Sequence, residues 1–566
     1  MMLTPQSDPV LGIQRVSLRG IRLAFVSIRG RGQNTFGMIC LICGCWAILA
    51  LATATSQASD SSLPDVYSQD VARFERLVTS YVAELRIEGI QGLSHLKHWP
   101  AEEALIGRLR DPSEAVRCAA VDALCRLGTT RSVPHLIRLM DHPQWHTKRR
   151  VHLALQRMTA RDLGDQRQAW QAWWDTGTSE SRQSELLAAL TTDANDPDSQ
   201  PTRTAALRAL VHLADASAES AIVRLLDTPP QPRLSEDERR YTIEVLERIG
   251  SPRAVPVLVR QRRDAAAWAL GRIGGEQAEQ GLLTFPLTLP VLMNLDRLHS
   301  EKCGPFVPRL VPRMGLVTYR SQPDDLHAPP TPFQRVAANL IRRSGAGPEL
   351  IEAILAELEA TADPDNPRPA PEPPEHLREL MVRFREELGP GFVRNDGVTT
   401  SQPLTALSLV ADDPALADRL IPLLHHPAFV VRIYVAMTLA NLNAMEALPE
   451  IVGIIRESYD FSDAATLVSG KHFDQSQTVR WRGFLCMALG RMGSPQARLI
   501  LEELAADPNQ FRDIRFGAVV GLGEIGSPES LPVLNQIAQQ DLLWMVRDTA
   551  RLAIEDIQIK IRAEPL

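Results

Sequence analysis

The sequence predicts an all-α fold, an α-solenoid of about eleven two-helix repeats interrupted by Pro-rich stretches. One twelve-residue pattern recurs about every 30 to 35 residues: a basic residue, then small residues and Leu, then a helix-ending Gly. Its clearest copies are Arg117–Gly128, Arg263–Gly274, Arg482–Gly493 and Arg515–Gly526. Recurrence at this period, with one helix in each half-repeat, is typical of α-solenoids.

The first helix of each repeat carries one apolar stripe. Small or apolar residues stand three, six, seven and ten positions after the first residue of the pattern, which is the spacing of one helix face. We call the first residue the anchor, and all eleven anchors except Gln334 are basic. We expect most anchors to tie one hairpin to the next through an Asp in the neighbouring turn, with a surface for an acidic partner as the alternative. The anchors are Arg86, Arg117, Lys148, Arg203, Arg239, Arg263, Gln334, Arg432, Arg482, Arg515 and Arg547.

The end of the pattern predicts where one helix stops and the next begins. Gly at the last position suits the left-handed residue that follows a helix. Three copies continue as Gly-Ser-Pro, at 250–252, 493–495 and 526–528, and Ser is a good N-cap while Pro suits the first helical position. Each unit should therefore be a helical hairpin, and we expect the second helices to line the inner face of the solenoid.

These residues resemble HEAT repeats, in the short bacterial form known as PBS lyase HEAT-like repeats. The closest copy is DPSEAVRCAAVDALCRLG, residues 111–128, and the resemblance covers most of residues 70–560. It implies an armadillo-like superhelix. It says little about activity, because the family includes scaffolds, adaptor surfaces, bilin lyases and an iron hydroxylase.

Breaks in the repeat spacing predict three parts in the solenoid. An N-terminal stack spans residues 69–283 and contains a Trp-rich insertion at 161–200. Residues 284–403 form a Pro-rich middle with one degenerate repeat, in which prolines exclude regular helices from much of 284–332. A C-terminal stack spans residues 404–562.

The pattern of residues 1–58 predicts an export signal or a membrane anchor. Phe36–Ala54 is an uncharged apolar run of 19 residues, with five arginines before it and small residues after it. This is the pattern of a cleaved secretory signal, although the run is also just long enough for an uncleaved anchor. Ile42–Cys45 faintly resembles a lipoprotein signal but lies in mid-run. All three alternatives predict an exported body, in the periplasm, cell envelope or extracellular space.

The net charge limits the classes of partner to expect, and the cysteine content limits the disulfides to expect. The chain carries −7, of which residues 1–58 contribute +4, so the remainder carries −11. An acidic body argues against nucleic acid as the main partner, because that binding depends on Lys and Arg at phosphates. We interpret Cys118, Cys125, Cys303 and Cys486 as small buried hydrophobic residues and expect no disulfide.

From the side-chain clusters in the sequence we predict no catalytic, cofactor-binding or metal-ligating residue. Trp170, Trp173 and Trp174 share one helix face, and we interpret them as filling the irregular repeat, with a binding platform as the alternative. HEAT-type hydroxylases hold iron with repeated His-Glu pairs, and none of the 13 histidines is followed by Glu. His142-Pro143 and His426-Pro427 occupy the turn position of Asp111-Pro112, so turn geometry explains them.

The sequence therefore predicts an exported scaffold that binds partner proteins, with no cofactor and no evident catalysis. The alternatives are a lyase or metal hydroxylase built on the same repeats, and a regulatory adaptor attached to a membrane by the N-terminal segment.

Overall fold

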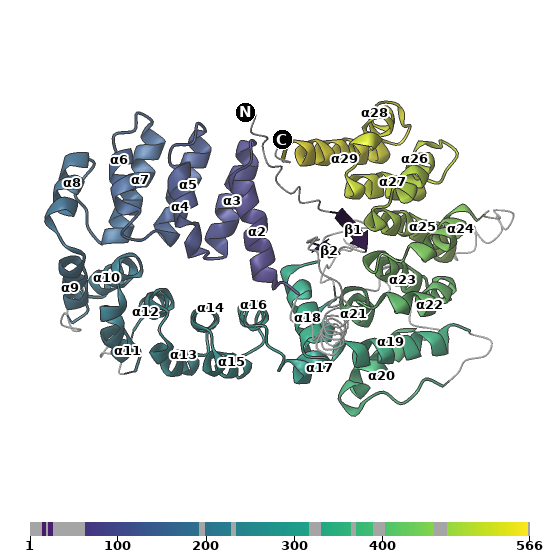
Figure 1. Ribbon diagram of the computed structural model, residues 1–566, viewed down its shortest axis with the longest axis horizontal. Coiled ribbons are helices and arrows are strands. Elements are labelled where there is room, and N and C mark those ends of the chain that lie inside the picture. The colour runs from purple at the N-terminus through teal and green to yellow at the C-terminus, as the bar shows by residue number, and fades with distance from the viewer. Residues whose placement is uncertain are drawn as a thin grey trace, which may run out of the picture. The chain divides into compact units, whose positions relative to one another are not determined.

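A computed structural model describes residues 14–18, 21–25, 63–191, 199–227, 234–315, 330–363, 369–388, 402–457 and 472–563 (Figure 1). Contacts between residues divide the chain into two compact units, Met1–Ser61 and Ser62–Leu566.

The described part of the first unit is a β-hairpin. Strand β1 (Gln14–Leu18) pairs antiparallel with β2 (Ile21–Phe25), with Val16 opposite Leu23. This hairpin lies outside the repeat body that the all-α prediction describes, in a segment where β-branched and apolar residues alternate with polar ones and favour strands. The apolar run at 36–54 lies outside the described residues, so signal and anchor stay predictions. None of the described helices has the length and apolar character needed to span a membrane.

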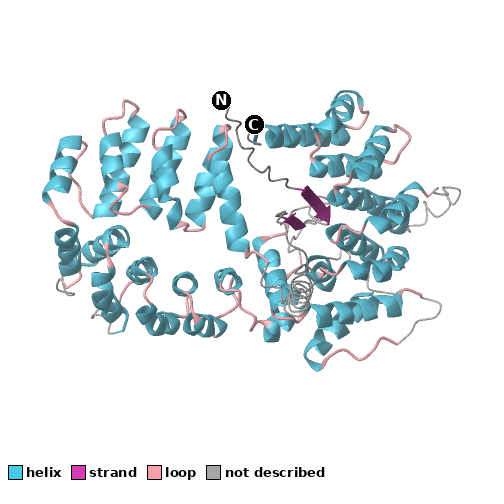
Figure 2. Cartoon of the chain, viewed as in Figure 1, coloured by secondary structure: helices cyan, strands magenta, loops and turns pink. Residues whose placement is uncertain are grey.

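The second unit is the predicted α-solenoid, and its helices account for all its described regular structure (Figure 2). The eleven predicted first helices all form, and two unpredicted ones, α16 and α21, fill the gaps so that each first helix contacts the next. The first helices are α3 (Ala83–His95), α5 (Glu114–Leu127), α7 (Trp145–Thr159), α10 (Ser199–Leu213), α12 (Glu236–Ile249), α14 (Asp264–Ile273), α16 (Leu289–Arg297), α18 (Pro332–Arg343), α21 (Gln402–Val410), α23 (Phe429–Asn441), α25 (His472–Met492), α27 (Arg512–Ile525) and α29 (Trp544–Ala563).

The second helices complete the hairpins, and many pack on the first helix that follows them. Several begin with a short 3₁₀ turn. The second helices are α4 (Glu102–Arg108), α6 (Val133–Leu139), α8 (Arg167–Thr176), α9 (Ser179–Ala189), α11 (Glu219–Asp227), α13 (Val255–Gln261), α15 (Glu276–Leu283), α17 (Val307–Leu310), α19 (Gly347–Thr361), α20 (Arg378–Leu388), α22 (Ala417–Leu420), α24 (Leu448–Arg456), α26 (Pro495–Ala506) and α28 (Leu531–Gln540).

One helix that the repeat pattern did not predict, α2 (Val66–Val78), begins the second unit. It packs on α3 and also contacts α16 and α18, far along the chain. The backbone N–H of Val66 donates to Asp296 Oδ2 at 2.8 Å, and Arg335 on α18 pairs with Asp70 at 2.7 Å. The N-terminal repeats, from α2 to α16, therefore curl until their two ends meet, and we call this part the N-terminal ring.

The apolar stripe of the first helices forms the core, as predicted. Residues three positions after the anchor are buried, such as Ala120 and Ala518, both 0% exposed. Residues seven positions after it are equally buried, such as Leu124 and Leu522. Small residues at one of these positions and Leu at the other let neighbouring first helices approach closely while filling the interior.

The anchors tie the repeats together, and the prediction is confirmed at several of them. Arg86 makes two hydrogen bonds, of 2.8 and 2.9 Å, to the carboxylate of Asp111 in the next turn. Arg515 pairs in the same way with Asp541. Arg203 instead reaches Glu238, at the start of the next first helix, at 2.9 Å. At these three anchors the basic residue links one hairpin to its successor through charge-assisted contacts, whereas Arg117, Arg432 and Arg547 donate to backbone carbonyl oxygens of the turn before their own helix.

Three of the four clearest glycines, Gly274, Gly493 and Gly526, adopt the predicted positive φ, and Gly250 does so as well. Gly250 and Gly526 adopt φ of 71° and 72°, and the following Ser251 and Ser527 accept hydrogen bonds as N-caps. The left-handed prediction is wrong for Gly128, whose φ is −62°. There the glycine serves close packing, because a Cβ would lie 2.5 Å from the carbonyl oxygen of Leu124.

The Pro-rich middle contains more helix than its prolines suggested. Pro290 stands in the first turn of α16, and Pro305, Pro308 and Pro312 occupy the first turns of short helical segments between 304 and 313. Proline is tolerated there because the first helical N–H groups have no partner within the helix. First helices α14, α16, α18 and α21 contact one another in succession. The three-part domain division stays a prediction.

Candidate functional site: a basic cavity and a groove lined by first helices

The hollows of the second unit are lined mainly by first helices, so the expectation that second helices line the inner face is wrong. The reason lies in the glycines with which neighbouring first helices touch. A Cβ added at Gly490 would lie 2.5 Å from the Cα of Gly521, and one added at Gly517 would lie 2.2 Å from the carbonyl oxygen of Gly483. First helices that approach this closely make their side of the stack the concave one.

The N-terminal ring encloses a cavity of about 500 Å³, which we call the basic cavity. Its lining comes from α3, α5, α7, α10 and α12, together with the turn after α3. Five lining side chains are Lys or Arg, two are His, and Glu244 is the single carboxylate among the lining residues. The cationic residues are Lys97, Arg126, Arg157, Arg208 and Arg240.

Contacts across the ring hold the cavity open in a fixed shape. Arg248 on α12 donates to the carbonyl oxygens of Leu127 and Gly128, at 2.8 and 2.6 Å, and His212 Nδ1 lies 2.8 Å from that of Gly128. The indole of Trp99 lies between two guanidinium groups, those of Arg248 and Arg272, at 4.3 and 4.1 Å. These cation–π contacts join residues far apart in sequence.

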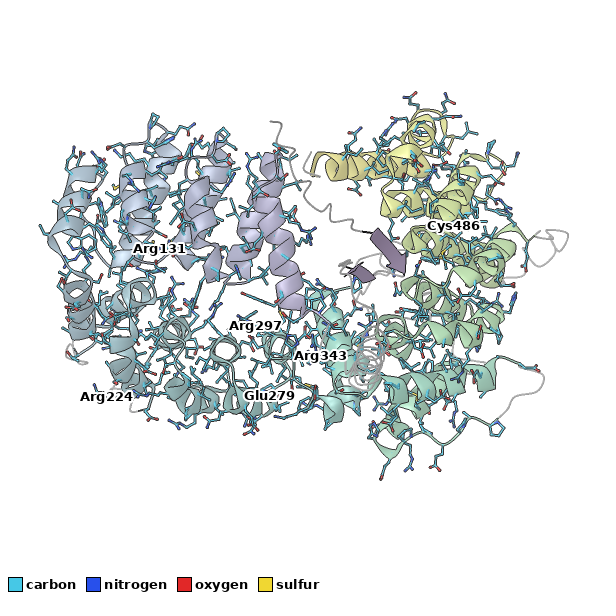
Figure 3. All side chains as sticks on the ribbon, viewed as in Figure 1. Arg131, Arg224, Glu279, Arg297, Arg343 and Cys486 are labelled. Carbon is cyan, nitrogen blue, oxygen red and sulfur yellow. The ribbon has the colours of Figure 1, made fainter. Side chains whose placement is uncertain are left out.

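A second closure lies where α16 and α18 meet α2. Arg343 on α18 pairs with Asp296 at 3.3 Å, and the guanidinium of Arg297 lies 4.4 Å from the ring centre of Tyr67 (Figure 3). Tyr67 lies on α2, whereas the other three side chains lie on α16 and α18, far along the chain. The ring is thus closed by buried polar contacts as well as by apolar packing.

Burial and charge set the protonation of the cavity wall. Burial lowers the pKa of His212 to about 4, so this imidazole is neutral near pH 7. Burial alone would lower the pKa of Lys97 as well, but Glu247 and Glu244 outweigh it and raise that pKa. Burial also raises the pKa of the Cys125 thiol, which therefore stays protonated and unreactive.

A repeat position that sequence reasoning missed supplies much of this charge. Nine residues after the anchor, a basic residue stands in each predicted first helix of the ring and in α18. The set is His95, Arg126, Arg157, His212, Arg248, Arg272 and Arg343. In the C-terminal repeats the same position holds Asn441, Arg491, Glu524 and Asp556, and Arg491 pairs with Glu524 at 3.1 Å. Comparing the repeats position by position could have found this stripe.

The C-terminal repeats line a larger hollow of about 1670 Å³, which we call the groove. Its residues come mainly from α18, α21, α23, α25, α27 and α29, and the N-terminal part of α2 adds a few more. The lining mixes small residues, such as Gly490 and Ala440, with amides, both signs of charge and the exposed Leu552.

The tryptophan cluster fills the irregular repeat, which confirms its structural interpretation. Trp170 on α8 is fully buried, and its indole N–H donates to the carbonyl oxygen of Gly164 at 2.7 Å. Trp173 and Trp174 are half-buried, and the guanidinium of Arg182 packs over both rings.

The turn histidines also have the role that their position predicted. His142 and His426 each accept a hydrogen bond at Nδ1 from the backbone N–H two residues on, at 3.2 and 3.0 Å. Asp111 accepts the equivalent bond from Ser113 at 3.0 Å. Over the described residues, His, Cys, Asp and Glu side chains nowhere gather in a group of three that could hold a metal ion. Cys118, Cys125, Cys303 and Cys486 are free thiols.

Comparison with known families identifies the repeats. Models of HEAT repeats match residues 72–156 and 465–555, and the PBS lyase HEAT-like repeat matches residues 262–285. No curated protein matches the chain.

Solved structures similar to the chain include importin beta and a Kap95 complex. A crystal structure of importin beta is 11% identical, with 88% of this chain and 85% of that chain covered and a TM-score of 0.27. The Kap95:Nup1 complex is 13% identical, with 86% and 73% covered and a TM-score of 0.26. At these scores the likeness carries no information on what this chain binds. The α-solenoid of this chain therefore contains HEAT repeats at residues 72–156 and 465–555 and a PBS lyase HEAT-like repeat at residues 262–285.

Proposed function

We propose that the chain is an exported, non-catalytic scaffold that binds a partner protein along the groove. The observation that carries the proposal is the groove itself, formed by consecutive first helices. Its volume of about 1670 Å³ exceeds the roughly 300–1,000 Å³ typical of small-molecule sites. Solenoids use such concave surfaces to bind extended partners over many side chains.

The lining of the groove suits a protein partner. The lining contains small residues, amide side chains and charged side chains of both signs. It also contains an apolar residue, Leu552, that is 61% exposed. Interfaces that form between separately folded proteins have this mixed character, with an apolar contact surrounded by polar groups.

Site-specific crosslinking tests the binding face. A photo-crosslinking residue is placed in the full chain at Leu552, and in a matched control at Leu499 on second helix α26, which is 57% exposed and does not line the groove. The expected result is one dominant adduct from position 552 in intact cells and none from 499. With the captured protein purified, Leu552→Arg should weaken binding by at least about tenfold, a typical loss for a buried contact, and Leu499→Arg should not. Equal amounts of adduct from both positions would show that the groove is not the binding face.

Export is tested separately by fractionation and intact mass. A cleaved signal predicts a mature chain that begins near residue 58 outside the cytosol, whereas an anchor predicts the full-length chain in the membrane fraction. Full-length protein in the cytosol would contradict both.

A further inference from the structure

We propose that the basic cavity binds a small multivalent oxyanion, a ligand carrying phosphate or several carboxylate groups. This site is separate from the groove and does not depend on the scaffold function.

The first argument is an excess of positive charge that the protein does not neutralise. Of the five Lys and Arg side chains in the wall, Lys97 pairs with Glu244 and Glu247, at 3.1 and 3.3 Å, and Arg240 pairs with Asp237 at 3.0 Å. Within the part of the chain that the structure describes, the remaining three form no ion pair. They are Arg126, Arg157 and Arg208.

The three unpaired arginines come from consecutive first helices, α5, α7 and α10, and all line one cavity. The Nε of Arg208 is buried and has no hydrogen-bond partner among the described residues. The acidic residue one helical turn before Arg126, Asp122, is paired with Arg150, and its charge also attracts Arg126 and Arg157. Arg126 and Arg157 are exposed and Arg208 is half-buried, so water screens part of their mutual repulsion. An anion with more than one charge relieves the repulsion that remains.

The second argument is that the cavity is built in advance. Comparable basic residues elsewhere on the ring are used as tethers: Arg248 and Arg272 hold Trp99, and Arg343 holds Asp296. At the same repeat position in the C-terminal stack, Arg491 is neutralised by Glu524. Arg126 and Arg157 hold this position without either kind of tether, and their side chains are exposed, with Arg157 hydrogen-bonded to the Cys125 thiol. The contacts across the ring fix the helices that carry these arginines, so little backbone has to be ordered when a ligand binds.

The third argument concerns the class of ligand. A volume of about 500 Å³ lies within the usual roughly 300–1,000 Å³ range of small-molecule sites. Guanidinium groups match phosphate and carboxylate oxygens with paired hydrogen bonds. Apolar surface from Trp99, Tyr241 and Val211 leaves room for an organic part of the ligand.

The test uses calorimetric titration of the full chain with pyrophosphate, with citrate, and with acetate as the monovalent control. We expect pyrophosphate or citrate to bind with a Kd of about 1 mM or tighter, and acetate not to bind in that range. Binding by pyrophosphate alone identifies a phosphate ligand, and binding by citrate alone identifies a polycarboxylate. Added salt should weaken the binding, because the attraction is electrostatic.

Three variants make the site assignment falsifiable. Arg157→Gln and Arg208→Gln should each weaken binding by at least about tenfold, as loss of a charge-assisted hydrogen bond does. Arg253→Gln, an exposed arginine outside the cavity, should leave it unchanged. Circular dichroism of each unliganded variant verifies the helical fold. Absence of binding by both polyvalent anions, or equal loss in the Arg253 variant, would overturn the proposal. Tighter, arginine-dependent binding of a Glu-rich peptide would also overturn it, since the ligand would then be a protein.

Discussion

At the scale of single residues, the turns between repeats use either a carboxylate or an imidazole to accept the same backbone hydrogen bond. Asp111 and His426 both accept a hydrogen bond from the backbone N–H two residues ahead. The carboxylate does so while paired with Arg86. The imidazole does so while 1% exposed, with its Nε2 3.0 Å from the Thr361 hydroxyl. The two solutions differ in how they respond to acid.

His426 makes the protein sensitive to mild acid. Burial, with a further contribution from Arg432, lowers the pKa of His426 to about 4. The unfolded chain, with a pKa near 6.5, binds the proton more readily, so stability is lost as pH falls from about 6.5 towards 4. His426→Asn should retain the turn hydrogen bond through its amide oxygen. It should also reduce the loss in free energy of unfolding between about pH 7 and pH 5 by roughly 1–2 kcal/mol.

Urea unfolding at the two pH values measures this difference. His425→Asn is the matched control, since His425 is exposed and its Nε2 lies 2.6 Å from Glu450 Oε1. If His425→Asn reduced the acid loss as much as His426→Asn, the effect would not come from the buried imidazole.

At the scale of helices, the glycines of the repeat have two separate uses. Gly526 ends α27 in the left-handed conformation with φ of 72°, and the N–H of that glycine donates to the carbonyl oxygen of Leu522 at 3.0 Å. Gly490 and Gly521 instead allow α25 and α27 to touch. A repeat pattern alone shows glycine at all three positions without distinguishing a helix end from a helix contact.

Alanine substitutions at two glycines should therefore change the free energy of unfolding in opposite directions. Gly526→Ala should lower the free energy of unfolding by about 1 kcal/mol, because a Cβ is strained in the left-handed region. Gly453→Ala, in the exposed interior of α24 with no atom near the new Cβ, should raise it by about 0.5–1 kcal/mol. Denaturant unfolding measures both values. A neutral Gly526→Ala would mean that α27 ends elsewhere.

At the scale of the second unit, long-range polar contacts close the N-terminal ring. Arg272 donates to the carbonyl oxygen of Lys97 at 2.8 Å across 175 positions of sequence. Burial lowers the pKa of Arg248 to about 10, so its guanidinium stays charged near pH 7 and continues to bind the end of α5. The indole of Trp99 separates these two cations.

Trp99→Ala should open the ring. Loss of two cation–π contacts and of the half-buried indole should cost about 2–4 kcal/mol. Amide hydrogen exchange at the ends of α3 and α5 should accelerate at least about tenfold, because local opening becomes less costly. Trp145→Ala is the control, since that ring is 60% exposed and contacts a single guanidinium, Arg149. Equal exchange in the two variants would show that Trp99 does not hold the closure.

The sequence by itself determined the repeating hairpin, the buried stripe and the link from Arg86 to Asp111, because each depends on residues within one repeat and its neighbour. The helices without an anchor, α16 and α21, could not be found in this way, since they lack the basic residue that defines the pattern.

Only the tertiary structure decided which side of the stack is concave and that α3 and α5 meet α12 and α14 across the ring. Curvature is the sum of small rotations between successive repeats, set by how closely each pair of helices packs and by the irregular stretches between them. No local pattern contains that sum. The gathering of Arg126, Arg157 and Arg208 around one cavity therefore follows from the closed ring, although their charge is plain in the sequence.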